Sequence, residues 1–457
     1  MSSPDFIFTA VVGVLGLTAL AFAVVLFSLV KLACGKGSPG FLVFFSVAWI
    51  AVVFYTLLVV VPPKLDSLLN GVIKNQKFHP VPEEHAKFHK TLSGEECLSC
   101  LGYFFFKKKK KKKVADLHAD SLMWPKRDLL TKNNYSHVDV PRLLQGRIAI
   151  QAFTIVSSSP AKLNFHSNAE PKGILSDQIV LKALLEQWGG LEVIHSIRAR
   201  AMFQIDQLHR FEARSNGALM VIKTKSDLEN VLRLHANGQA VVGGFLGVEG
   251  LHCLDSDWKN VQVLYDAGVR MAALTHFFDN SLGGSAHGVA KNGLTELGRK
   301  VLSEMVRLGM LIDVAHNSHA TIAEIIELTK GSNNSIIMTS HTGVQSVCDS
   351  FERNLNDDEI RAIAKSGGVV GIAFFSPAMC GDDILESILD SIIYVKNLVG
   401  IEHVGLGSDW DGTVKTPIDA SQTLHISSGL LRRGLTEQET RLVMGENVFR
   451  MLRRVLP

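Results

Sequence analysis

Two long uncharged runs set the N-terminal part of the chain apart from the rest. Residues 6–30 and 41–61 contain no Asp, Glu, Lys or Arg. Each run is long enough for a helix to cross the hydrocarbon core of a bilayer, which needs about 20 apolar residues. The first run is too long for the apolar part of a cleaved signal peptide. We therefore expect residues 1–63 to form a membrane anchor of two transmembrane helices, with everything downstream on the same side as the N-terminus.

A polar stretch without sustained hydrophobic periodicity follows, and residues 64–113 are expected to be a disordered linker. It includes the run FFFKKKKKKK at 104–113. This run could be a polybasic patch for anionic lipid, a solvated charge run, or a translated non-coding tract, and the last two interpretations are favoured. The Cys97 and Cys100 pair has no second cysteine pair beside it and carries little functional weight.

Residues 114–457 alternate short β-rich apolar runs with amphipathic helical patterns. This alternation is typical of an α/β fold with parallel strands. Helical patterns occupy 294–309, 319–330, 357–367 and 384–400, and the longer gap at 157–239 is expected to hold extra helices. Eight units predict a (β/α)8 barrel with insertions, and an open doubly wound sheet is the alternative. The expected strands are 114–118, 148–156, 240–248, 269–275, 310–315, 335–340, 368–374 and 403–408.

Charge excludes one class of function. The 457 residues include 47 Lys and Arg against 44 Asp and Glu, a formal net charge of +3. Seven of the positive charges lie in the lysine run at 107–113, so the rest of the chain is close to neutral. A nucleic-acid binder would spread basic residues over one face. We therefore expect no nucleic-acid partner.

Residues that can bind metals recur where the expected strands end. The first strand ends in a His-x-Asp pair, and residues two apart in a strand point to the same face. The carboxyl ends of all barrel strands meet at one face, where active sites of this fold lie. One such residue could be a loop residue or a helix cap, but six strand ends repeat the pattern. The residues are His118, Asp120, Glu249, His276, His316, His341 and Asp409.

A centre with two metals explains this number of ligands better than one metal does. A catalytic zinc ion uses three protein ligands and a water. Five candidate ligands can instead serve two ions, with Glu249 bridging them through its two carboxylate oxygens. One ion would take His118 and Asp120, and the other His316 and His341. Two ions about 3.5–4 Å apart can hold a bridging hydroxide that is nucleophilic at neutral pH.

The motifs DLHAD, GVEG, LTH, LIDVAH, SH and GSDWDG occur here in that order, with Arg353-Asn354 following SH. In these motifs, residues 114–457 resemble the membrane (renal) dipeptidase family. The resemblance implies a (β/α)8 barrel with two zinc ions that cleaves dipeptides. It implies the five ligands given above, with Glu249 bridging.

The resemblance also implies roles for three further residues. His276 would contact the substrate and polarise the oxygen of the scissile carbonyl group. Arg353 would pair with the C-terminal carboxylate of the substrate, which a planar guanidinium matches well. Asp409 would accept a proton from the attacking water and pass it to the leaving amine, with Asp411 as the second choice for this role.

The chain also departs from the family pattern. Leu117 and Ala119 stand where better-known members carry Gly and Asn, and the segment before Arg353 is one residue longer. Phe277-Phe278 replaces a Ser-Cys pair, so one disulfide of those members cannot form. The resemblance implies a different bridge, Cys348–Cys380, and the loops after consecutive barrel strands are neighbours. Because disulfides persist in oxidising compartments, we expect the catalytic domain to be extracytoplasmic.

The sequence therefore predicts a membrane-anchored, zinc-dependent dipeptidase whose substrate is a small dipeptide. The same barrel and metals could instead serve a hydrolase for N-acyl amino acids, lactones or other small amides, because fold does not fix substrate. A third interpretation is a degenerate barrel that serves as a binding module on a membrane and catalyses no reaction. The intact ligand set with Asp409 argues against it. Arg353 favours the dipeptidase. A second copy of the chain, forming a homodimer, is a candidate partner.

Overall fold

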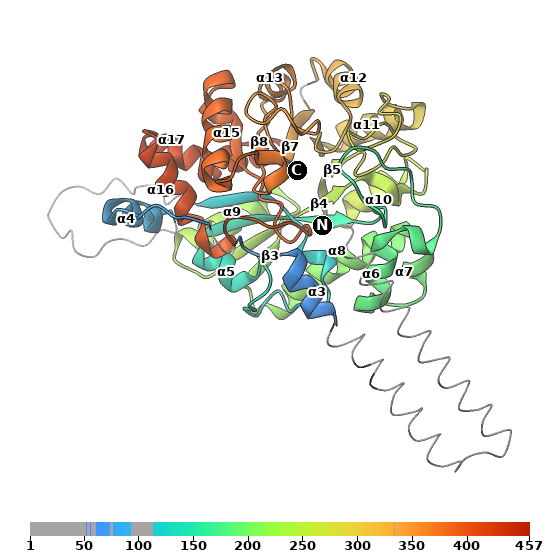
Figure 1. The fold of residues 1–457 in the computed structure, drawn as a ribbon, viewed down its shortest axis with the longest axis horizontal. Coiled ribbons are helices and arrows are strands. Elements are labelled where there is room, and N and C mark those ends of the chain that lie inside the picture. The colour runs from blue at the N-terminus through green and yellow to red at the C-terminus, as the bar shows by residue number, and fades with distance from the viewer. Residues whose placement is uncertain (1–51, 53–54, 56–60, 74–75, 93–112, 333) are drawn as a thin grey trace, which may run out of the picture.

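The computed structural model describes residues 52, 55, 61–73, 76–92, 113–332 and 334–457 (Figure 1). Apart from residues 52, 55 and 61, the expected membrane spans at 6–30 and 41–61 lie outside the described residues, and so does the Cys97 and Cys100 pair. Within the described part of the chain, none of the helices has both the length and the apolar character that a membrane crossing requires.

Eight parallel strands close into a barrel. The hydrogen-bonded order is β2-β1-β9-β8-β7-β6-β5-β4, and a pairing between β2 and β4 closes the ring. Every residue of these strands is buried, as in parallel sheets that are covered on both faces. All eight expected strands are present, so the (β/α)8 prediction is confirmed and the open sheet was the wrong alternative. The strands are β1 (Val114–Ala119), β2 (Ile148–Val156), β4 (Val242–Glu249), β5 (Val269–Ala273), β6 (Leu311–Asp313), β7 (Ile336–Thr342), β8 (Val370–Ile372) and β9 (Val404–Leu406).

A ninth short strand, β3 (Leu219–Val221), was not expected. It pairs with the first residues of β4, while β5 pairs with the last ones. It belongs to the insertion between β2 and β4, which also holds the helices α6 (Gln178–Glu186), α7 (Glu192–His195) and α8 (Ile197–Arg214). It lies within the 157–239 gap, where the sequence analysis expected only extra helices.

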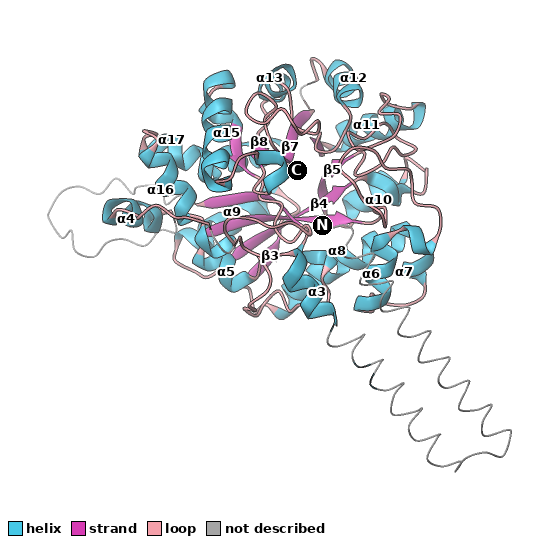
Figure 2. Cartoon of the chain, viewed as in Figure 1, coloured by secondary structure: helices cyan, strands magenta, loops and turns pink. Residues whose placement is uncertain are grey.

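Helices surround the barrel (Figure 2). Local sequence fixes their ends. Asn356 and Glu359 form a reciprocal capping box at the start of α13, and Gly367 ends that helix in the left-handed conformation that glycine adopts most easily. The four expected helices correspond to α11, α12, α13 and α15. The insertion also holds α9 (Lys225–Ala236), and α5 (Val140–Gln145) precedes β2. The helices after the insertion are α10 (Asn260–Asp266), α11 (Glu296–Leu308), α12 (His319–Thr329), α13 (Asp357–Ser366), α14 (Ser376–Met379), α15 (Ile384–Val399), α16 (Leu424–Arg432), α17 (Glu437–Arg441) and α18 (Asn447–Val455).

The segment upstream of the barrel is more ordered than expected. It contains α3 (Val61–Leu69) and α4 (Glu83–Thr91), so the prediction of a disordered linker is wrong for these residues. Both helices bury side chains against the barrel domain, among them Leu69 on α3 and Phe88 on α4. Each helix has only nine residues, which is too short for its sequence to show a sustained periodicity. Lys113, the last lysine of the run, is also buried.

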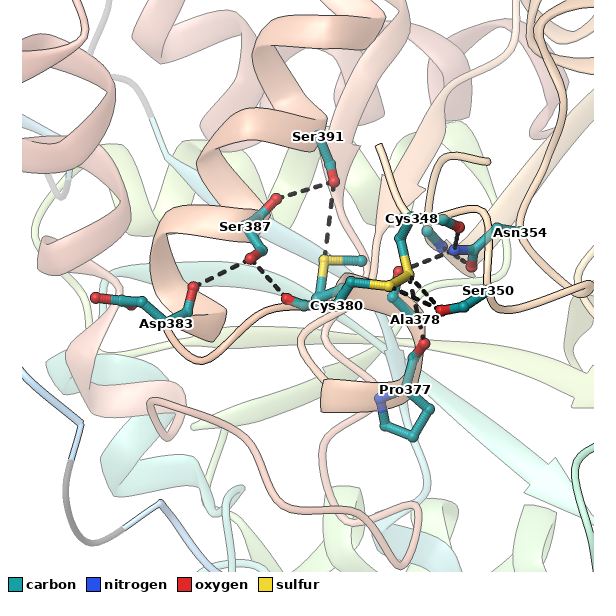
Figure 3. The surroundings of a disulfide bond; sticks show 11 residues. Cys348, Ser350, Asn354, Pro377, Ala378, Cys380, Asp383, Ser387 and Ser391 are labelled. Atoms are coloured by element: carbon teal, nitrogen blue, oxygen red, sulfur yellow. Dashed lines mark hydrogen bonds between the residues drawn. A yellow bond between two sulfur atoms is a disulfide. The ribbon is translucent and has the colours of Figure 1, made fainter. Parts of the chain in front are cut away.

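A disulfide bond joins the loops after β7 and β8 (Figure 3). The structure contains the Cys348–Cys380 bond, with the two Cα atoms 5.5 Å apart. The Asn354 side chain ties the same loops, because its Nδ2 donates to the carbonyl oxygens of Cys348 at 2.9 Å and Ala378 at 3.0 Å. The bond therefore restrains the segment that carries Arg353. Among the described cysteines, Cys253 is free and buried.

Removing this bond should destabilise the barrel. The bond closes a loop with a sequence separation of 32 residues. Replacing Cys348 and Cys380 with alanine should lower the free energy of unfolding by about 3–4 kcal/mol, mainly by releasing the unfolded chain. Calorimetry measures the change, and Cys253→Ala is the control because it removes a thiol without a bond. Thiol labelling of both Cys348 and Cys380 in protein isolated under non-reducing conditions would contradict the bond itself.

Candidate metal and catalytic centre

The barrel brings the strand-end residues together at its carboxyl face. His118 lies in β1, Glu249 is the last residue of β4, and His341 lies in β7. The other members occupy positions just after β1, β5, β6 and β9, namely Asp120, His276, His316 and Asp409. All seven are buried. A parallel barrel places the ends of all its strands on one face, so residues far apart in sequence meet there.

The Glu249 carboxylate lies at the middle of this cluster. Its Oε1 is 2.9 Å from His316 Nε2 and 3.4 Å from His341 Nε2. Its Oε2 is 3.4 Å from His276 Nε2 and 3.7 Å from His118 Nε2. The two oxygens therefore face two different sets of imidazoles, as a bridging carboxylate must.

Three overlapping groups of side chains could each hold a metal ion. In each group, one ligand atom from every residue lies within 4.8 Å of the others. Glu249 belongs to two groups, which match the two sets expected from the sequence. A third group brings Asp409 beside two of the histidines. The groups are His118, Asp120 and Glu249; Glu249, His316 and His341; and His118, His341 and Asp409.

The charge states of these residues fit a metal centre. Burial, and then the Arg353 guanidinium, lower the pKa of His316 and His341 well below the usual value, so both rings are neutral. Burial raises the pKa of Asp409 and Glu249, and the Asp120 carboxylate raises both further. Neutral imidazoles and crowded carboxylates are the donors that zinc binds. A cation would relieve the repulsion between the carboxylates.

Buried nitrogen atoms without a suitable partner provide a second test. His118 Nε2 makes no hydrogen bond with any described residue. The Nε2 atoms of His316 and His341 lie 3.0 Å apart. A neutral imidazole has one donor and one acceptor nitrogen, so a contact between two ring nitrogens uses the acceptor of only one ring. The residues therefore fit metal ions better than they fit one another.

Side chains that the sequence analysis did not identify form hydrogen bonds with the candidate metal ligands. The Ser340 hydroxyl lies 2.9 Å from His118 Nδ1 and 3.0 Å from His341 Nδ1. Thr154 Oγ1 donates to Asp120 Oδ1 at 2.6 Å. Such contacts fix the ring tautomer and leave Nε2 free to bind a metal. No local signal reveals Ser340, because its role depends on two strands meeting in space.

Asp409 and Asp411, the two candidates for proton transfer, have different surroundings. Asp409 Oδ1 lies 3.9 Å from His118 Nε2, inside the cluster. Asp411 is fully buried, and its carboxylate pairs with Arg127 at 2.7 Å and accepts from Ser121 Oγ at 2.7 Å. It belongs to none of the metal-binding groups found among the described residues. The geometry therefore favours Asp409 over Asp411.

Arg353 lies beside the cluster with unused hydrogen-bonding capacity. Its Nη2 is 3.0 Å from His316 Nε2. Its Nη1 is buried and has no hydrogen-bond partner among the described residues. A buried guanidinium with a free donor is suited to an anion such as a carboxylate. Arg353 thus lies beside the cluster despite the longer segment before it.

Aromatic rings line the same side of the centre as Arg353. The Phe277 ring lies 4.2 Å from the His276 ring and 5.1 Å from the His316 ring, measured between centroids. The Arg353 guanidinium carbon lies 5.6 Å from the centre of the Phe375 ring. Further contacts connect these rings to Phe165, His287 and Phe351. Of the four phenylalanines, the sequence singled out only Phe277, as a departure from the family pattern.

Comparison with known proteins connects this geometry to a family. A family model described as membrane dipeptidase (peptidase family M19) matches residues 108–456. Dipeptidase verJ from Clonostachys rogersoniana is 30% identical over 323 residues, which cover 69% of this chain and 75% of that protein. Dipeptidase tcpJ from Claviceps purpurea (strain 20.1) is 27% identical over 351 residues, which cover 74% of this chain and 73% of that protein.

Solved structures share the fold. The crystal structure of dipeptidase AC, a metallopeptidase of family M19, has a TM-score of 0.63 and 23% identity, and the match covers 75% of this chain and 99% of that one. A metallopeptidase from Rhodobacter sphaeroides, solved with a phosphinate mimic of the dipeptide L-Ala-D-Ala, has a TM-score of 0.61 and 22% identity, with the same two coverages. At these identities the likeness supports the barrel fold.

Neutralising the central carboxylate should weaken metal binding at both positions. Glu249→Gln leaves an amide that bridges poorly between two ions. We expect metal analysis to find about two equivalents of zinc in the wild type, since its ligands exceed what one ion uses, and well below that in the variant. Glu304→Gln is the matched control, because Glu304 is buried but lies on α11 and pairs with Arg307. Unchanged zinc content in Glu249→Gln would contradict the binuclear assignment.

Proposed function

Because this chain belongs to the membrane dipeptidase family, we propose that it is a membrane-anchored dipeptidase with two zinc ions. The observation that carries the proposal is the Glu249 carboxylate, which presents one oxygen to His118 and His276 and the other to His316 and His341. Arg353, beside this cluster, supplies a guanidinium group that binds the free carboxylate of the dipeptide.

In this proposal, five side chains hold the two ions, and Glu249 contacts both. When bound, the ions supply a water that ionises near neutral pH. His118 and Asp120 bind one ion, and His316 and His341 bind the other. Ser340 holds two of the rings by their Nδ1 atoms, so that each presents Nε2 to a metal.

The remaining residues orient the dipeptide and move the proton. The His276 ring is neutral, because burial lowers its pKa well below the usual value. Its Nε2, which faces Glu249, donates to the oxygen of the scissile carbonyl group. Asp409 takes up a proton at a carboxylate oxygen and delivers it to the nitrogen of the leaving amine. Burial raises the pKa of Asp409 well above the usual value, which favours proton uptake.

Membrane attachment and compartment complete the proposal. The uncharged runs at 6–30 and 41–61 support an anchor of two helices. The Cys348–Cys380 bond supports an oxidising compartment, because cytosolic thiols are kept reduced. An even number of crossings would then place the N-terminus on the extracytoplasmic side as well.

A substrate panel tests the activity. The purified full chain, loaded with zinc, should hydrolyse unmodified dipeptides and lose this activity on chelation. N-acetyl amino acids and lactones serve as the alternative substrates, because they offer a hydrolysable amide or ester bond without a free amino group. Asp409→Asn should lower kcat for the dipeptides by roughly 10²–10⁴-fold, the usual contribution of a general acid–base, while zinc content stays normal. Faster turnover of N-acetyl amino acids than of any dipeptide would overturn the assignment.

A second experiment tests how the substrate carboxylate is recognised. Wild-type enzyme should prefer a dipeptide over the same dipeptide with its carboxylate converted to an amide. Arg353→Ala should remove this preference and mainly raise KM for the free dipeptide, because Arg353 contacts a group remote from the reacting bond. Arg353→Lys keeps the charge but loses the planar guanidinium. Its KM and its preference for the free carboxylate should lie between those of the wild type and Arg353→Ala. A preference that survives Arg353→Ala would show that another group reads the carboxylate.

A further inference from the structure

The loop after β9 has an unfavourable backbone conformation. Asp409, Asp411 and Thr413 have φ angles of 62°, 65° and 63°. Side chains with a Cβ atom rarely adopt this left-handed region, because Cβ approaches the following carbonyl oxygen. Three such residues in a stretch of five need external contacts to hold them. The loop carries the proposed proton-transfer residue, so whatever holds the loop also places that carboxylate.

Asp411 provides much of this support from within the barrel domain. Its Oδ1 accepts from the backbone N–H of His137 at 2.8 Å. Its backbone carbonyl oxygen accepts from Trp124 Nε1 at 2.8 Å. Its Oδ2 pairs with Arg127, which is buried. The loop is therefore fixed by a buried carboxylate whose counter-charge is a buried guanidinium.

The counter-charge depends in turn on α3. Asp66 accepts from Arg127 through both of its carboxylate oxygens, from Nε to one and from Nη2 to the other. Asn70, just after the helix, donates to Asp66 Oδ1 at 3.0 Å. Arg127 therefore lies between two buried carboxylates, one from the loop and one from α3. Without Asp66, the Nε and Nη2 donors of a buried guanidinium would lose their partners, which is costly.

The segment after α3 also contacts the loop directly. Asn70 Oδ1 accepts from the backbone N–H of Thr413 at 2.8 Å. Two residues later, Val72 forms a parallel bridge with Thr416, and the N–H of Ile73 donates to the Thr416 carbonyl oxygen at 2.9 Å. The upstream chain thus holds the loop through Arg127 and along its backbone.

We propose that residues 61–73 are a clamp for the catalytic loop, with Asp66 and Asn70 as positioning residues for Asp409. The loop is fixed at its other side by β1, since the N–H of Asp120 donates to the Trp410 carbonyl oxygen at 2.9 Å. The family match begins at residue 108, so the clamp lies outside it. The functional unit of this chain therefore extends upstream to Val61. The kinetic part of this proposal rests on the function proposed above.

Hydrogen exchange in the full chain tests the clamp without relying on activity. In Asp66→Asn and Asn70→Ala, peptides covering 409–416 should exchange at least about tenfold faster, because local opening of the loop costs less free energy. Peptides covering β7 should be unchanged. Asp66→Glu keeps the carboxylate and should restore slow exchange in part. Asn70→Ala removes few hydrogen bonds, so it remains informative if Asp66→Asn folds poorly.

Kinetics separate positioning from general stability. Both variants should lower kcat by about tenfold or more, since a displacement of about 1 Å can cost 10²-fold, with KM and zinc content near normal. Phe88→Ala is the control, because it removes a buried side chain from α4, which packs against α16. Unchanged hydrogen exchange at 409–416 in both variants would overturn the clamp. It would also be overturned if Phe88→Ala changed hydrogen exchange at 409–416 and kcat as much as these variants do. A wild-type chain without dipeptidase activity would refute the proposed function but leave the exchange test valid.

Discussion

One buried carboxylate facing four imidazoles is the constraint on which the carboxyl face depends. Glu249 lies among histidines supplied by β1, β5, β6 and β7 or by the residues just after them. A buried cluster of this kind is unfavourable unless its charges and lone pairs find partners. In the barrel, the strands fix the positions of these residues. Contacts such as those of the Ser340 hydroxyl with the His118 and His341 rings orient their side chains. The fold itself thus positions a cluster of side chains that could hold metal ions.

The sequence could bring these candidate ligands together because each lies at or just after the end of a strand. Buried parallel strands show as continuous apolar runs, and the first polar residue after each run marks the carboxyl face. His118, Glu249 and His341 could therefore be placed together without knowledge of their distances. Ser340 and Thr154 could not be found this way, because the contacts of Ser340 with His118 and of Thr154 with Asp120 join residues far apart in the sequence. The same holds for Phe165, Phe351 and Phe375, which look like ordinary core residues until the loops are folded.

The largest difference between sequence and structure lies upstream of the barrel. Residues 64–92 appear as a polar linker because α3 and α4 have only nine residues each. A pattern of apolar residues reports burial by hydrophobic contact. It does not report attachment through charge, and α3 is attached in part through the ion pair of Asp66 with Arg127. A buried ion pair between segments 61 residues apart leaves no periodic trace in either segment.

The position of α3 also bears on how the enzyme would face a membrane. The uncharged run at 41–61 ends where α3 begins, and α3 has nine residues, about 14 Å at the usual helical rise. Asn70, just after this helix, contacts the loop after β9, which lies on the carboxyl face of the barrel. The anchor proposed from the run at 41–61 would therefore join the domain beside the loop that carries Asp409.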